Sequence, residues 1–214
     1  MIVTQIYNTK QFTDDVSRIT YSYAQTNLGE DIIHTRLSEE SLLAVEKDLT
    51  NLKVEEDNRI YAKSHLAGDL KQEYDLRRTE TPVVYSTLYH YLLSAIQTQI
   101  PINEFLFDAM WINFQNATEH NPLHSHSNGT KLSFVLYLQM PDNIEEELEE
   151  QAQESNAISR GTIQFISSST NNLITLIPNR GDLLVFNSQH LHQVYPFYGE
   201  GTRITIAGNI KDYV

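Results

Sequence analysis

NPLHSHSNGTKLSFVLYL, residues 121–138, is the stretch that decides the expected fold, because two closely spaced histidines lead directly into an apolar run. Side chains two positions apart on a strand face the same side, so His124 and His126 can reach a common point. A third histidine, His192, lies in LLVFNSQHLHQV, residues 183–194. If the strands between them are antiparallel and curl back on themselves, the three imidazoles converge. Convergent imidazoles predict a metal site.

The other histidines carry weaker signals, and an HxH pair by itself is often only two surface or turn residues. His190 is a rival ligand, but we expect it beside the metal site or at its rim. His120 is expected in a surface loop. Three histidines without a companion motif are expected at the surface or on a helix face, namely His34, His65 and His90.

From residue 101 onward the apolar period changes from 3.6 to 2, which is typical of strands. Turn residues separate seven short segments, which are FLFDAMWINFQ, KLSFVLYLQM, GTIQFI, LITLI, GDLLVFN, HQVYPF and TRITIAGNI. Short strands that follow two helices predict a mainly β fold. The expected architecture is a double-stranded β-helix, or jelly roll, with the N-terminal helices packed outside the sheet.

The N-terminal part, residues 1–100, is expected to be helical and irregular. Ser38 can cap an amphipathic helix that ends near Leu52. Thr81 and Pro82 form the start signal of a second helix, whose apolar side should lie against the sheet. One or two irregular strands are expected before residue 36, and residues 59–76 are interpreted as polar and mostly exposed.

Length and composition limit the possible classes. The chain has 214 residues, 40% of them hydrophobic, which suffices for a single domain, 1–214, with a β core at 101–214. The net charge of −13 argues against nonspecific nucleic-acid binding. The sequence has no cysteine, so imidazole and oxygen must hold any transition metal. No stretch fits a signal peptide or a membrane helix, so a cytoplasmic protein is expected.

Residues 142–160, DNIEEELEEQAQESNAISR, carry a cluster of glutamates that cannot bury itself. We expect a solvated acidic loop or a short exposed helix. A lid that orders over a substrate is the second interpretation.

Arg203 opens the last apolar segment, eleven residues after His192. An arginine that faces inward from a strand is costly to bury unless an anion meets it. Thr205 faces the same side and offers its hydroxyl to the same anion. These two residues therefore predict an anion-binding group beside the metal site.

In order and spacing, these residues resemble the iron(II)- and 2-oxoglutarate-dependent oxygenases. The resemblance covers residues 111–209 and extends to small prolyl-hydroxylase-like proteins, including oxygenases of marine phages. It implies that His124 and His192 bind Fe(II), that Arg203 grips the far carboxylate of 2-oxoglutarate, and that O2 is the oxidant. It also implies contacts to the co-substrate from Tyr137 and Asn113.

The family usually has Asp or Glu at the middle ligand, where this chain has His126. Three interpretations stay open. His126 itself ligates, which we favour because it needs no rearrangement; a carboxylate such as Glu119 swings in; or the site is incomplete and inactive.

The resemblance implies a 2-oxoglutarate-dependent dioxygenase that hydroxylates a peptide or protein side chain, or a small molecule, with release of succinate and CO2. One alternative is a non-catalytic jelly-roll module that binds a metal or an anion. Another is a cupin-like three-histidine dioxygenase that does not use 2-oxoglutarate. No nucleic acid or membrane partner is expected, and the location would be the host cytoplasm if the protein belongs to a phage. Substrate and oligomeric state stay open.

Overall fold

The computed structural model describes residues 20–22, 32–50, 52, 68–78, 80–126, 129–155, 159–166 and 172–213. The predictions that concern residues 1–19 and His65 lie outside these described residues. Within the described part, the helices are all too short or too polar to cross a membrane.

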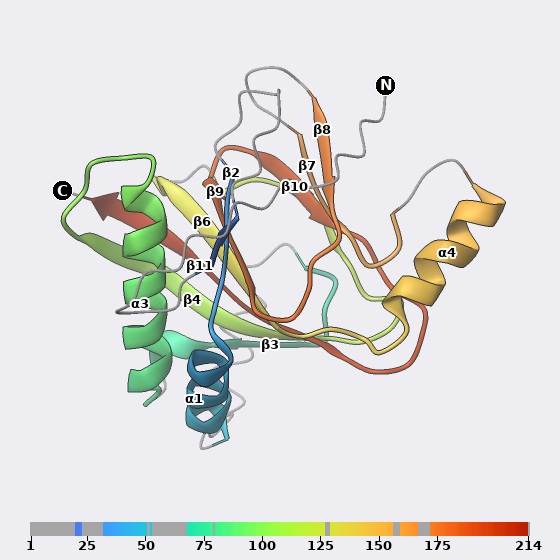
Figure 1. Cartoon of the computed structure of the whole chain (residues 1–214), viewed down its shortest axis with the longest axis horizontal. Helices are drawn as coiled ribbons and strands as arrows, with labels where there is room; N and C mark the ends of the chain where they lie inside the picture. Colours follow the sequence, from blue (N-terminus) through green and yellow to red (C-terminus); the bar gives the residue numbers. More distant parts are fainter. Residues whose placement is uncertain are drawn as a thin grey trace.

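The described strands form two antiparallel sheets (Figure 1). The larger sheet has seven strands in the order β1-β2-β9-β6-β11-β4-β3, and the smaller has four in the order β5-β10-β7-β8. The strands are β1 (Thr20–Ser22), β2 (Ile32–Arg36), β3 (Gln72–Asp75), β4 (Phe105–Gln115), β5 (Asn121–His124), β6 (Leu132–Gln139), β7 (Ile163–Ile166), β8 (Leu173–Leu176), β9 (Asp182–Asn187), β10 (Leu191–Val194) and β11 (Arg203–Tyr213). The predicted mainly β fold is confirmed.

The two sheets face each other across a small apolar core. Phe165 of β7 and Ile174 of β8 pack against Leu184 and Phe186 of β9 and against Tyr137 of β6. Phe165 and Phe186 meet edge to face, with ring centroids 4.8 Å apart. This core closes one side of the space between the sheets, and the candidate site lies in the same space.

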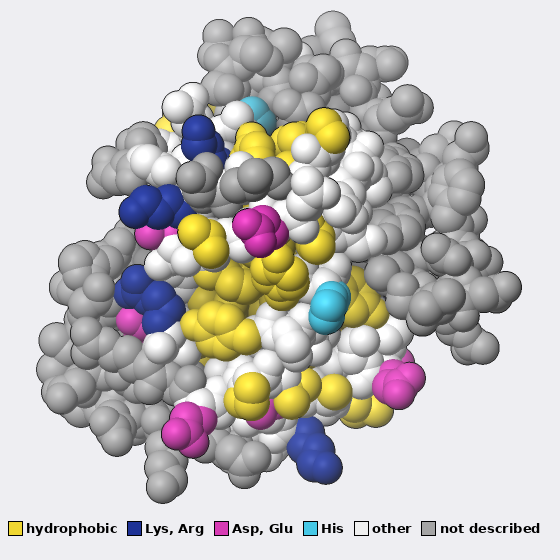
Figure 2. Space-filling model, turned by 90° about the vertical axis from the view of Figure 1, so that its left-hand side faces the viewer, with side chains coloured by type: hydrophobic (Ala, Val, Ile, Leu, Met, Phe, Trp, Pro, Cys, Tyr) yellow, Lys and Arg dark blue, Asp and Glu magenta, His cyan; other side chains and the backbone are white. Residues whose placement is uncertain are grey.

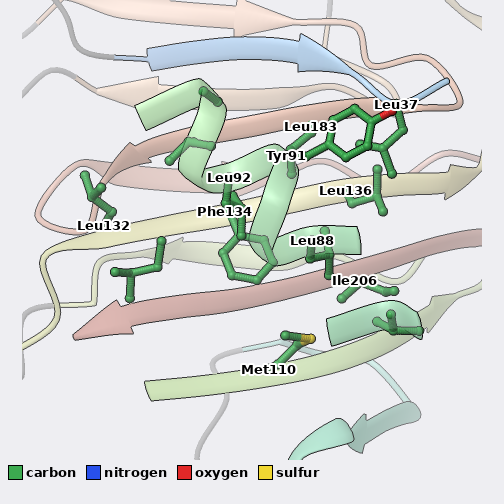
Figure 3. Close-up of a cluster of buried hydrophobic side chains, with 14 of the residues drawn as sticks. Leu37, Leu88, Tyr91, Leu92, Met110, Leu132, Phe134, Leu136, Leu183 and Ile206 are labelled. Atoms are coloured by element: carbon green, nitrogen blue, oxygen red, sulfur yellow. The ribbon is translucent and has the colours of Figure 1, made fainter. Parts of the chain in front are cut away.

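Helix α3 (Pro82–Gln97) covers the outer face of the larger sheet, with α1 (Glu39–Leu49) beside it (Figure 1). Figure 3 shows Leu88 and Leu92 of α3 directed at Phe134 and Ile206 of the sheet. Alternate residues on each strand face opposite sides of a sheet, so one set of positions packs on these helices and the alternate set faces the smaller sheet. The prediction that the N-terminal helices pack outside the sheet is confirmed.

Aromatic side chains surround α3. Tyr89 stacks on Phe105 of β4, with centroids 4.6 Å apart, and Tyr85 meets Phe107 edge to face at 5.7 Å. Figure 2, which faces the α3 side of the molecule, shows hydrophobic side chains gathered over this surface. The aromatic positions therefore fasten α3 to β4, as expected for aromatic residues at regular helical spacing.

The helix starts differ in how they are capped. The Ser38 hydroxyl accepts a hydrogen bond from the Ser41 backbone N–H at 3.2 Å, as predicted for α1. Thr81 makes no side-chain cap for α3. Instead, the Asp48 carboxylate at the end of α1 accepts from the backbone N–H groups of Val83 and Val84 at 2.9 and 3.0 Å. A residue distant in sequence thus caps the second helix.

The expectation that residues 59–76 are mostly exposed is wrong for the part that the structure describes. Leu70, Glu73, Asp75 and Leu76 are all buried. Strand β3 pairs with β4 at the edge of the larger sheet, and Asp75 bonds Arg77 through both carboxylate oxygens. The sequence pattern does not predict this buried edge strand, because its polar side chains are buried with partners that the pattern does not reveal.

The acidic segment forms helix α4 (Ile144–Glu154), the second of the two forms expected for it. The expectation that none of its glutamates is buried is wrong, because Glu147 is only 7% exposed. Its carboxylate accepts the backbone N–H groups of Tyr198, at 2.8 Å, and of Gly199. Ile144 and Leu148 pack on Phe197, so α4 docks on the loop that precedes β11.

Candidate metal centre and anion pocket

Three histidines meet at one end of the smaller sheet. His124 ends β5, His192 lies opposite it on the neighbouring β10, and His126 follows β5 by two residues. One ring nitrogen from each lies within 4.8 Å of the others. The ring centroids are 4.2 Å apart for His124 and His192 and 5.0 Å apart for His124 and His126. The predicted convergence of the three imidazoles is therefore present.

Backbone carbonyls orient two of the rings. The Nδ1 of His124 lies 2.7 Å from the carbonyl oxygen of Pro122, and the Nδ1 of His192 lies 2.9 Å from that of His190. A carbonyl oxygen only accepts, so each Nδ1 must carry the proton and each Nε2 keeps its lone pair. This arrangement, in which the second ring nitrogen donates to a carbonyl, is typical of metal-binding histidines.

Burial keeps the three imidazoles neutral. It lowers the pKa of His192 to about 3, with the neighbouring His124 as the next cause. Burial and then His124 lower the pKa of His126 to about 4, and burial also lowers the pKa of His124. Neutral imidazole is the form that binds a metal ion.

The position usually occupied by a carboxylate holds an imidazole. The backbone of His126 is fixed by bonds to the carbonyl of Ser188 at 2.8 Å and from the Thr130 hydroxyl at 2.7 Å. Glu119, the alternative ligand, bonds the backbone N–H of Asn116 at 2.9 Å and lies in a different turn. No carboxylate among the described residues joins the group of three histidines.

Next to the histidines, a small polar cavity lies between the two sheets. It has a volume of about 60 Å³, roughly four times what one water molecule needs. Trp111, Asn113 and Gln115 of β4 line it from one strand, and Arg203 and Thr205 line it from the adjacent β11. Trp111 is buried, and its ring centroid lies 6.1 Å from that of His126.

Arg203 is 1% exposed, and neutral oxygens of the protein satisfy most of its donors. Its Nε and Nη2 donate to the Gln115 Oε1 at 3.1 and 2.8 Å. Nη1 donates to the Gly161 carbonyl at 2.6 Å, and Nη2 also donates to the Tyr195 carbonyl at 3.0 Å. Four of the five guanidinium N–H groups are thus used, and one on Nη1 is left.

The charge of Arg203 is not neutralised in the same way. Among the described residues, no carboxylate lies within ion-pair distance of its guanidinium. Burial lowers the pKa of Arg203 to about 10, which still leaves it protonated at neutral pH. Neutral groups therefore satisfy most hydrogen bonds of this arginine, and the anion expected from the sequence stays a prediction for its charge.

Three further polar side chains lie in the same cavity. Thr205 is paired in the sheet with both Asn113 and Tyr137, and the Asn113 amide donates to its hydroxyl at 3.3 Å. Within the described part of the chain, the Tyr137 hydroxyl and the Asn113 Oδ1 are buried without a hydrogen-bond partner. Burial raises the pKa of Tyr137, so its hydroxyl keeps a proton to donate. A buried polar group without a partner is costly and indicates a ligand or ordered water.

Other residues considered from the sequence have structural roles. Asp182 begins β9, accepts from the Asn179 backbone N–H at 2.7 Å and pairs with Arg36 at 2.7 Å, so it stabilises the turn before β9. His34 is not a simple surface residue, because it lies on β2 and its Nε2 is 3.0 Å from Asp182. The backbone carbonyl of His190 bonds the Nδ1 of His192. The backbone of His120 forms an isolated β-bridge with that of Asp69.

Gln115 is the site residue that the sequence argument missed. It lies two positions beyond Asn113 on the same face of β4, and its partner in the β4–β11 register is Arg203. The period of two along FLFDAMWINFQ could have placed it in the cavity. Its contact with Arg203 depends on the pairing of two strands far apart in sequence, which the pattern alone does not give.

Comparisons with known proteins agree with this arrangement. Residues 109–209 match a protein-family model described as "Putative 2OG-Fe(II) oxygenase". No curated protein matches the sequence. That family implies Fe(II), 2-oxoglutarate and O2 as cofactor and co-substrates.

Several solved structures are similar in fold. An oxidoreductase of the 2OG-Fe(II) oxygenase family from Burkholderia pseudomallei has a TM-score of 0.58 at 10% identity, with 84% of this chain and 85% of that chain covered. A prolyl-4-hydroxylase from Pseudomonas putida has a TM-score of 0.53 at 16% identity, covering 86% and 93%. A prolyl hydroxylase from Trichoplax adhaerens, solved with a hypoxia inducible factor peptide fragment, has a TM-score of 0.54 at 15% identity, covering 87% and 84%. The predicted double-stranded β-helix is confirmed.

Proposed function

We propose that this chain is a 2-oxoglutarate-dependent hydroxylase, because residues 109–209 match a family model of 2OG-Fe(II) oxygenases. The oxidised group would be a C–H bond of a peptide or protein side chain, or of a small molecule. The co-substrate would leave as succinate and CO2. Bound Fe(II) would supply the activation of O2, and the protein supplies binding, orientation and exclusion of water.

In this proposal His124, His126 and His192 hold the metal. Three neutral imidazoles converge, which supports this assignment. In His124 and His192 the Nδ1 bonds a backbone carbonyl, so the Nε2 lone pair stays available for a metal. Three ligands on one face of an ion leave positions open for co-substrate and O2. The residues present therefore fit a divalent iron, with an all-imidazole face in place of the usual two histidines and one carboxylate.

The anion pocket is proposed to take the far carboxylate of 2-oxoglutarate. Arg203 offers its remaining N–H and an uncompensated charge, and the Tyr137 hydroxyl offers a proton that nothing in the described part of the chain accepts. Thr205 and Asn113 would complete the polar lining. The single observation that carries the proposal is a buried, unneutralised guanidinium in the same cavity as three convergent imidazoles.

A peptide proline is the first substrate class to test. The support is an analogy, since two of the similar structures are prolyl hydroxylases and one of them was solved with a peptide. We propose that the substrate reaches the metal past Trp111, whose ring lies 6.1 Å from that of His126.

Two observations favour the alternatives. The imidazole at position 126 favours a three-histidine dioxygenase that needs no 2-oxoglutarate, because that class uses three histidines. The four bonds from Arg203 to protein oxygens favour a structural role in a non-catalytic module. The three-histidine dioxygenase predicts that 2-oxoglutarate does not bind, and the non-catalytic module predicts no turnover.

The deciding experiment measures 2-oxoglutarate binding and turnover together. The purified protein is titrated with Fe(II) and then 2-oxoglutarate without oxygen, and succinate is measured after air is admitted. We expect one iron per chain, a change in its absorption on adding 2-oxoglutarate, and slow succinate formation.

In the Arg203→Ala variant the affinity for 2-oxoglutarate should fall by a factor on the order of tenfold to a hundredfold. Lys211→Ala, at the exposed end of the same strand, should keep the affinity of the wild type. Iron binding without any response to 2-oxoglutarate in the wild type would refute the proposal and support the three-histidine alternative. Absence of succinate formation at any iron concentration would support the non-catalytic module.

A further inference from the structure

We infer that Gln115 is a positioning residue that fixes Arg203 and, because it is an amide and not a carboxylate, keeps the charge of Arg203 available for an anionic ligand. The inference rests on the proposed function, since the anion is taken to be the far carboxylate of 2-oxoglutarate. Gln115 contacts Nε and Nη2 of Arg203, whereas the anion would contact the remaining N–H on Nη1.

The geometry fixes which end of the Gln115 amide faces Arg203. Its Nε2 donates to the backbone carbonyl of Glu119 at 2.5 Å, so its Oε1 must point the other way. That oxygen accepts two guanidinium bonds, from Nε at 3.1 Å and from Nη2 at 2.8 Å. A single oxygen shared by two N–H groups of one planar guanidinium sets both the place and the plane of the group.

The turn after β4 holds the Glu119 carbonyl in place. Thr118 adopts a positive φ of 70°, which is uncommon for a residue other than glycine, and its N–H donates to the Phe197 carbonyl at 2.8 Å. The Glu119 carboxylate accepts from the Asn116 N–H at 2.9 Å. The Phe197 ring in turn lies 5.8 Å from the Arg203 guanidinium carbon. The turn therefore connects Gln115 to the loop that closes over the arginine.

The chemical type of residue 115 decides the charge of the pocket. Gln115 is 3% exposed, so any charge at this position would act at short range in a low dielectric. A glutamate there has almost the same volume; it would lose the bond to the Glu119 carbonyl and form a charge-neutral pair with Arg203. A neutral pair would satisfy the guanidinium and remove the attraction for a second carboxylate. A glutamine gives the same orientation without that loss.

The test compares two ligands in the Gln115→Glu variant. Both are 2-oxo acids of the same chain length, namely 2-oxoglutarate and 2-oxopentanoate, in which a methyl group replaces the far carboxylate. Their dissociation constants are measured on the Fe(II)-loaded protein without oxygen. The wild type should favour 2-oxoglutarate by a factor on the order of tenfold to a hundredfold, the usual value of a hydrogen-bonded charge.

In Gln115→Glu this preference should fall to a few-fold or less, with the affinity for 2-oxopentanoate and for Fe(II) itself nearly unchanged. The matched control is Gln139→Glu, which adds the same charge at the exposed end of β6 and should keep the full preference. A purely structural role would weaken both ligands equally and so leave the ratio unchanged. That outcome would overturn the inference.

The two possible failures can be told apart. If the wild type already binds both 2-oxo acids equally, the proposed role of Arg203 fails, and the inference fails with it. If the wild type discriminates and Gln115→Glu discriminates equally well, only the inference fails.

Should Gln115→Glu not fold, as judged by its thermal transition, Gln115→Met provides the same comparison. It removes the acceptor without adding charge, so the guanidinium loses two bonds, and the preference should fall by several-fold. An unchanged preference in Gln115→Met would also overturn the inference.

Discussion

In the metal-free protein, acid should unfold the chain through its three site histidines well before its carboxylates are protonated. Burial lowers the pKa of His192 to about 3 and of His126 to about 4, and it lowers that of His124 as well. The same groups have a pKa near 6.5 in the unfolded chain. At a pH between the native and the unfolded pKa values, these imidazoles are protonated in the unfolded state and neutral in the native state.

The sign follows from this difference. Above pH about 6.5 the imidazoles are neutral in both states, so their contribution to stability does not depend on pH. As the pH falls toward 4, protonation favours the unfolded state, and each imidazole removes up to about 1.4 kcal/mol of stability per pH unit. Between pH 7 and pH 5, each of His126 and His192 should remove about 1.9 kcal/mol, or about 4 kcal/mol together. His124 adds a smaller or equal loss in the same direction.

Urea unfolding in the presence of a chelator at pH 7, 6 and 5 measures this loss, because the free energy is obtained by linear extrapolation at each pH. The informative variant is His192→Asn, whose amide nitrogen can still donate to the His190 carbonyl as the ring Nδ1 does. It should lose about 1.9 kcal/mol less than the wild type between pH 7 and pH 5. The matched control is His90→Asn on the exposed side of α3, which should follow the wild type.

Identical pH dependence in the wild type and in His192→Asn would refute the reasoning. It would mean that this imidazole is as easily protonated in the native protein as in the unfolded one. The site would then be open to water, and the pocket that we describe would not be closed in solution.

A saturating divalent ion should raise the stability at pH 7 by about 2.7 kcal/mol at a hundred times its dissociation constant.

Three further predictions follow from single contacts. Tyr137→Phe should weaken 2-oxoglutarate binding about tenfold without lowering the stability of the ligand-free protein in urea, because the lost hydroxyl has no partner among the described residues; an unchanged dissociation constant would contradict this. Glu147→Gln should cost about 1–3 kcal/mol in urea unfolding, because its amide nitrogen would face one of the two backbone N–H groups that the carboxylate oxygens accept, whereas Glu149→Gln on the exposed face of α4 should change stability by less than about 0.5 kcal/mol. Asp48→Ala should cost about 1 kcal/mol in the same assay by removing the cap of α3, and equal stability would show that the Asp48 carboxylate contributes no net capping energy.

The parts of the fold that the sequence predicts correctly are those with a strong period. In FLFDAMWINFQ the alternation sends Met110 and Ile112 toward the helices and Asn113 toward the cavity, and β4 has the predicted bounds. The site histidines were predictable for the same reason, since a spacing of two puts His124 and His126 on one side. The convergence with His192 needed only that β5 and β10 pair.

The parts that the sequence does not predict depend on partners distant in the chain. From the sequence, Arg203 is expected to need an anion. Two of its hydrogen bonds go instead to the backbone carbonyls of Gly161 and Tyr195, in loops where no side chain indicates this contact. Glu147 reads as solvated until the backbone N–H groups of residues 198 and 199 are placed against it. Backbone donors and acceptors are present at almost every position, so no residue type marks where they are used.

Charge links the two halves of the site. Three neutral imidazoles leave both charges of a bound divalent ion in place, and Gln115 leaves the charge of Arg203 in place. In the usual triad one carboxylate would offset part of that charge. Here no described carboxylate does so, which makes a small dianion the best complement to the cavity. In the proposed function 2-oxoglutarate would be such a dianion, with one carboxylate at the metal and one at Arg203. This charge argument weighs against the three-histidine alternative, which the imidazole at position 126 favours when ligand type alone is considered.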